Sequence, residues 1–104
     1  MKENKLVQEI FYTIESLKQD NSLLKGLGPV RTRIPRTRLF LFYNQYTGCK
    51  QDAFNRNFIP SLKLFGIIGA YEDGYPFFED DYKKLICRYP SLFKDVKRLV
   101  DGKG

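Results

Sequence analysis

Residues 51–68 read QDAFNRNFIPSLKLFGII and contain both a helical pattern and an obstacle to it. Apolar residues recur at three- and four-residue steps, the spacing of one face of an α-helix: Phe54, Phe58, Ile59, Leu62 and Phe65. Pro60 lies among them, and an interior proline removes an amide donor at a cost of roughly 3 kcal/mol. We therefore predict a helix that begins near residues 50–52, bends after Arg56 and ends at Gly66.

Asn57 offers a way to lower the cost of Pro60. If the helix restarts with Asn57 as its N-cap, Pro60 falls in the first turn, where its missing amide has no intrahelical partner to lose. The stretch is then two segments, QDAFNR with outward polar residues and SLKLFGII, which packs inward and leads into a hairpin.

Two more helices are predicted before this stretch. Residues 3–19 carry one apolar stripe with Lys, Glu and Gln opposite, which is the pattern of an amphipathic helix. In residues 30–34 the arginines alternate with other residues, as in a short strand, and Pro35 ends that strand. A helix then runs from Pro35 or Arg36 to about Tyr46 and stops at a tight turn. For the apolar run 39–43, a buried strand is the alternative.

A hairpin and two helices are predicted after it. Ile67 and Ile68 form the first arm, residues 72–74 the turn, and residues 75–78 the return arm, with Pro76 limiting the pairing. One helix covers about residues 80–89. After a break at Pro90, Ser91 is the predicted N-cap of a last helix that ends near Val100.

Composition predicts one soluble, intracellular domain and argues against catalysis. The chain has 104 residues with 42% hydrophobic content, enough for one core, and its nine Phe and seven Tyr predict a core of large rings. No apolar run is long enough to cross a bilayer. The chain has no His and no CxxC, so we expect no zinc site, no cofactor and no catalytic residue, with Cys49 and Cys87 as buried reduced thiols.

The net charge of +6 is unevenly distributed. Residues 21–63 contain eight Lys or Arg and one acid, whereas residues 64–81 contain five acids and no base. Charges that serve solubility alone would be better mixed. The basic block predicts a polyanionic partner, and nucleic acid is the commonest.

Residues 39–78 resemble the winged helix-turn-helix family of DNA-binding domains. In that family a helix, a short turn and a recognition helix precede the wing, and the recognition helix ends in a Leu four residues before a Gly and two apolar residues. Here these are Leu62, Gly66, Ile67 and Ile68. The pattern also occurs at ordinary helix-to-strand junctions.

The resemblance implies a mainly α fold with a small β-hairpin. It would be a single winged helix-turn-helix domain over residues 1–104, with a core of about 30–79 and extra helices at about 3–19 and 80–100. Small proteins of this kind from archaeal plasmids and viruses, including centromere-binding segregation proteins, are similar in size and composition. The implied function is sequence-specific binding of double-stranded DNA in the cytoplasm, on the nucleoid, as a transcription regulator or plasmid or viral partition protein.

The outward face of the stretch carries the residue types that contact base edges. With Phe54, Phe58 and Leu62 inward, Asp52 and the three predicted base-contacting residues point outward in the first two turns: Gln51, Asn55 and Arg56. The predicted phosphate contacts are cations around this helix: Arg31, Arg33, Arg36, Arg38, Lys50 and Lys63. The alternatives are a solvated helix face and a basic loop that only aids solubility.

The predicted wing departs from the family because its tip is acidic. Glu72 and Asp73 at the turn are followed by Glu79, Asp80 and Asp81, and phosphate would repel all five. We expect this hairpin to face away from DNA or to contact protein. The terminal helices predict a homodimer, with cover for a monomeric core as the alternative. The alternative function is a protein-interaction adaptor on the same scaffold.

Overall fold

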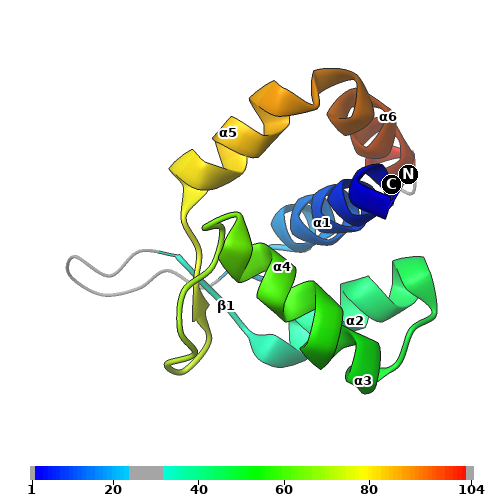
Figure 1. Ribbon diagram of the computed structural model, residues 1–104. Helices are drawn as coiled ribbons and strands as arrows, with labels where there is room; N and C mark the ends of the chain where they lie inside the picture. The colour runs from blue at the N-terminus through cyan, green and yellow to red at the C-terminus, as the bar shows by residue number, and fades with distance from the viewer. Residues whose placement is uncertain (1, 24–31, 103–104) are drawn as a thin grey trace.

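The computed structural model describes residues 2–23 and 32–102 (Figure 1). The described chain is mainly helical with one small antiparallel sheet, in agreement with the coarse fold class predicted from the sequence. Its elements in chain order are α1 (Lys2–Gln19), β1 (Arg33–Ile34), α2 (Arg36–Thr47), α3 (Gln51–Ala53), the π-helix η1 (Phe54–Phe58), α4 (Ile59–Leu64), β2 (Tyr75–Pro76), α5 (Glu79–Arg88) and α6 (Pro90–Asp101).

α1 is the central helix of the fold and packs against both α2 and α6 (Figure 1). Its predicted apolar stripe is buried from Val7 to Leu17, and the ring of Tyr12 stacks on Tyr46 of α2 with 4.5 Å between centroids. Glu15, predicted on the polar face, is instead only 6% exposed. Neighbouring elements thus bury α1 on all sides over residues 10–17, which an amphipathic pattern does not indicate.

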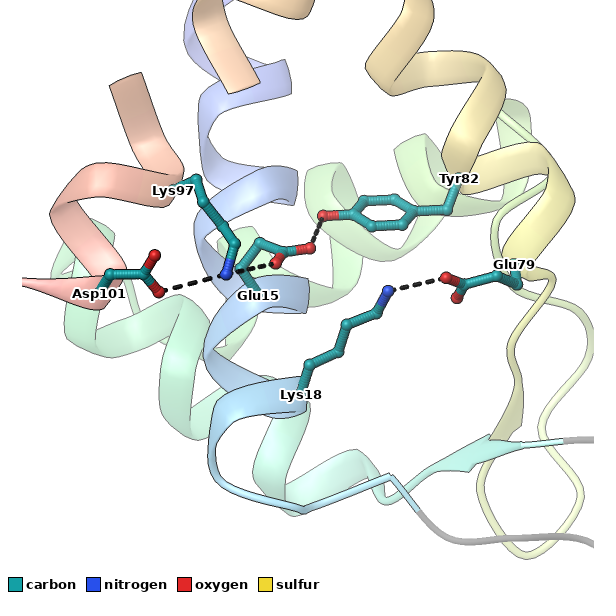
Figure 2. Close-up of polar contacts among 6 residues, drawn as sticks. All are labelled: Glu15, Lys18, Glu79, Tyr82, Lys97 and Asp101. Atoms are coloured by element: carbon teal, nitrogen blue, oxygen red, sulfur yellow. Dashed lines mark hydrogen bonds and ion pairs between the residues drawn. The ribbon is translucent and has the colours of Figure 1, made fainter. Parts of the chain in front are cut away.

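A buried carboxylate joins three helices through the contacts drawn in Figure 2. Glu15 of α1 accepts a 2.7 Å hydrogen bond from the hydroxyl of Tyr82 on α5, and the Nζ of Lys97 on α6 lies 3.6 Å from its other oxygen. Lys97 also reaches Asp101 at 3.2 Å. Three positions after Glu15 on α1, Lys18 forms a 2.8 Å ion pair with Glu79 of α5. These contacts attach α5 and α6 to the central helix.

The helix α2 confirms the predicted helix and rules out a strand over residues 39–43. It ends at Gly48, whose φ of 73° lies in the left-handed region and whose amide bonds to the carbonyl of Asn44. The turn that follows is held by side chains: Thr47 Oγ1 accepts from the amide of Cys49, and Asn44 Nδ2 donates to the Cys49 carbonyl.

The chain stays helical from Gln51 to Leu64, so the predicted restart at Asn57 is wrong. Asn57 caps nothing. Instead the backbone forms a π-helix over residues 54–58, and the amide of Ile59 bonds to the carbonyl of Phe54, five residues earlier. This wider turn directly precedes Pro60 and relieves the contact between the proline ring and the preceding carbonyls. The irregularity occurs where the bend was predicted, but without a break.

The predicted return arm makes the short pairing expected with the first arm, and it also pairs with β1, which was not expected. β2 lies antiparallel to β1, with Arg33 opposite Pro76 and Ile34 opposite Tyr75. Toward the predicted first arm there is a single bridge, between Ile68 and Phe77. Phe77 donates its amide to the carbonyl of Thr32, just before β1, and the carbonyl of Pro76 accepts from Gly69 on the other side. The missing amide of Pro76 therefore falls on the side of residues 67–69, which keeps that pairing short.

Two further local predictions, the N-cap of α6 and the burial of the thiols, were wrong. Tyr89 precedes α6 and Pro90 occupies its first turn, so Ser91 is not the N-cap. The thiols are not buried, because Cys49 is half-buried and Cys87 is exposed. The core contains many large rings beside its aliphatic residues, with Phe11, Tyr12, Phe54, Phe58 and Tyr82 among the largest fully buried side chains. None of the described helices is long and apolar enough to span a membrane.

Candidate functional site

The helical stretch that starts at Gln51 has one buried apolar face and one exposed polar face. Phe54, Phe58 and Leu62 are at most 1% exposed. Five polar residues of the first two turns are exposed: Gln51, Asp52, Asn55, Arg56 and Asn57. Four of these were predicted to point outward. Asn57 was not, because it was predicted to be the N-cap of a second helical segment.

Aromatic contacts pack the buried face of the stretch against α2. The ring of Phe58 lies 4.4 Å from that of Tyr43, and the ring of Phe54 lies 5.2 Å from that of Phe40 in an edge-on contact. Burial, together with the neighbouring Cys49 thiol, raises the pKa of Tyr43 to about 12, so this tyrosine is neutral at physiological pH. The exposed face therefore rests on a fixed layer of rings.

Arg36, a predicted phosphate contact, is hydrogen-bonded to Asn55, a predicted base contact. Its Nη1 donates to the hydroxyl of Tyr75 on β2, and its Nη2 donates to Oδ1 of Asn55 on η1. The guanidinium also lies over the ring of Phe54, with 5.4 Å from Cζ to the ring centroid. No local pattern in the sequence indicated a role for Tyr75, which is 39 positions away from Arg36.

Arg56 and Asp52 form an ion pair one helical turn apart. Arg56 Nε lies 3.2 Å from Asp52 Oδ1, and both side chains are 77% exposed. Exposed pairs of this kind contribute little in water, so the guanidinium can exchange Asp52 for another anion at small cost. Gln51 is exposed beside this pair at the start of α3.

The other predicted phosphate contacts occupy separate places around the helical stretch. Lys50 immediately precedes α3, and Lys63 is exposed near the end of α4. Arg38 on α2 is exposed and lies 3.8 Å from Asp20. Arg33 is half-buried in β1. Arg31 lies outside the described residues.

The acidic turn is well formed and exposed. Asp73 adopts a left-handed φ of 55° and Gly74 a φ of 119°. Addition of a Cβ at Gly74 would meet the backbone oxygen of Ile34 at 3.1 Å, so both the conformation and the space favour glycine. Glu72 and Asp73 are exposed, as is 56% of Tyr71.

Comparison with known proteins found no relative: no family model, no curated protein and no solved structure matches this chain. Any function must therefore be argued from the geometry above.

Proposed function

We propose that the chain is a non-enzymatic, sequence-specific binder of double-stranded DNA with a winged helix-turn-helix architecture. The observation that carries the proposal is the exposed face of Gln51, Asn55 and Arg56, backed by the buried rings of Phe54 and Phe58. A helix of this kind fits the major groove, where Arg pairs with guanine and Asn or Gln with adenine. Its rigid support is what discrimination between bases requires.

The order of the elements supports the winged architecture. α2 and the α3–η1–α4 stretch are joined by a turn of three residues, 48–50, as in a helix-turn-helix. β1 precedes this pair and β2 follows it, and the two strands pair with one another. In this proposal the hairpin of residues 67–78, with the acidic turn at its tip, forms the wing, and β1 pairs with its return arm.

The cations around the stretch would contact the phosphates on either side of the groove. Lys50 and Lys63 lie toward opposite ends of the helical stretch, and Arg33 and Arg38 precede it on β1 and α2. Each phosphate contact releases counterions, so binding must weaken as salt is added. The acidic turn at Glu72 and Asp73 is directed away from DNA in this proposal and is available to a protein partner.

A homodimer would match such a protein to a palindromic site. The apolar stripe of α1 is buried against α2 and α6, so α1 has little surface left for a second chain. We therefore place the dimer contact on the outer face of α6, where Leu99 is 50% exposed. Such a dimer, bound to its DNA site on the nucleoid, could act in transcription regulation or in partition of plasmid or viral DNA.

Binding to duplex DNA tests the proposal. Fluorescence anisotropy would be measured with a pool of randomised duplexes at several salt concentrations. Four phosphate contacts predict a loss of affinity of about a hundredfold between roughly 50 and 200 mM salt. A chain that binds no duplex at the lowest salt, while circular dichroism shows it folded, would overturn the proposal.

A further inference from the structure

Arg36 makes three contacts that a phosphate-binding arginine does not need. Its two terminal nitrogens donate to Tyr75 and Asn55, and its plane lies over the ring of Phe54. Tyr75 is 3% exposed and Phe54 is 1% exposed, so two of the three partners belong to the core. The guanidinium is therefore held by rigid groups, and Asn55 is the only exposed group among them.

The contact with Asn55 has a chemical consequence for the amide. An asparagine side chain can accept through its oxygen and donate through its nitrogen, and rotation exchanges the two ends. Because Arg36 has only donors, it selects the oxygen and fixes the plane of the amide. The two N–H donors of Asn55 are then left for another acceptor. In the major groove such acceptors are N7 and O6 of guanine, N7 of adenine and O4 of thymine.

We propose that Arg36 is a positioning residue that sets the sequence preference of Asn55, rather than a phosphate contact. This inference rests on the proposed DNA binding. Tyr75 holds Arg36 from β2, and Arg36 in turn presents the Asn55 amide as a donor toward a purine or thymine edge. Strand β2 thus acts on base recognition without a contact to DNA of its own.

The test compares charge-conserving variants. The preferred site of the wild-type chain is first selected from randomised duplexes, and affinities are then measured for all four base pairs at each position. Asn55→Ala identifies the position that Asn55 contacts, where discrimination should fall about tenfold or more. Arg36→Lys keeps the positive charge but loses the planar fork, so it should lower discrimination at that same position and leave the other positions unchanged.

Two further variants separate positioning from simple structural support. Tyr75→Phe retains the buried ring and removes only the hydroxyl that holds Arg36, so its discrimination should fall at the same position. Asn55→Asp still pairs with Arg36 but has no donor, so it should shift the preference toward cytosine, whose amino group donates. Arg88→Lys is the matched control, since Arg88 is exposed on α5, outside the proposed DNA contacts, and it should keep the wild-type preference.

The outcomes are distinguishable. If Arg36→Lys and Asn55→Ala impair the same position and the double variant is no worse than either, the two residues act as one unit. If Arg36→Lys keeps the full preference, or weakens all duplexes equally, the positioning role is wrong while DNA binding stands. If the wild type binds every duplex equally or none, the proposed function itself fails. Urea unfolding of each variant confirms that the fold persists.

Discussion

The hydroxyl of Tyr82 donates a 2.7 Å hydrogen bond to the carboxylate of Glu15, from a residue 67 positions away in the chain. Both groups are buried, with Glu15 6% exposed and Tyr82 fully enclosed. A buried carboxylate requires polar partners, and Figure 2 shows two for Glu15: the hydrogen bond from the Tyr82 hydroxyl and the ion pair with Lys97. The pair therefore holds α5 to the central helix.

Tyr82→Phe is expected to destabilise the chain by about 1–3 kcal/mol, because it leaves a buried charged acceptor without its hydrogen bond while the ring still fills its space. Urea unfolding followed by circular dichroism measures this. Tyr71→Phe removes a hydroxyl from a side chain that is 56% exposed and should change little. Equal effects of the two substitutions would contradict the role of the buried bond.

Alkaline pH should destabilise the wild type more than Tyr82→Phe. Burial and the adjacent Glu15 carboxylate raise the pKa of Tyr82 far above its usual value near 10. The folded state thus retains a proton that the unfolded state loses, so stability is complete below about pH 10 and falls as the pH rises further. Urea midpoints at about pH 9 and pH 11 measure the difference, and parallel curves would rule it out.

Gly48→Ala is expected to cost about 1–2 kcal/mol, because the φ of 73° is unfavourable for a residue with a side chain. An added Cβ would meet nothing within 4 Å, so the conformation alone is responsible. Gly48→Asn should cost less, since asparagine tolerates this region. The prediction fails if alanine and asparagine are equally well tolerated in thermal or urea unfolding.

Arg56→Ala should relax the sequence preference, whereas Arg33→Ala should weaken binding to all duplexes about equally and reduce the salt dependence by roughly one phosphate contact. In the proposed complex Arg56 would exchange its exposed pairing with Asp52 for a base, whereas Arg33 on β1 would contact a phosphate. Anisotropy titrations against the selected site and its single-base variants provide the measurement. A uniform loss for Arg56→Ala would assign it to phosphate.

Leu99→Lys should convert a dimer into a monomer without unfolding it, because Leu99 is half exposed on α6. Light scattering at micromolar concentration measures the mass. Leu41→Lys is the control, since Leu41 is 47% exposed on α2, away from the proposed contact. A wild-type chain that is monomeric under these conditions would remove the dimer from the proposal.

Local patterns in the sequence predicted most helices and the two faces of the helical stretch. The four-residue spacing of Phe54, Phe58 and Leu62 was sufficient to place their side chains inward and Gln51, Asn55 and Arg56 outward. Pro60 was correctly identified as a source of irregularity. Its form was wrong because a π-helix depends on small backbone adjustments that no residue type specifies.

The sequence by itself determined which segments are helical, because amphipathic spacing, Pro35 and Gly48 act over a few residues. The tertiary structure alone decided which distant groups meet: β1 with β2, Tyr82 with Glu15, and Arg36 with Tyr75 and Asn55. Such contacts arise from packing among segments that are 19 to 67 positions apart. The physical reason is that the hydrophobic pattern of a segment specifies which of its faces is buried. Which other segment packs against that face is decided only when the whole core assembles.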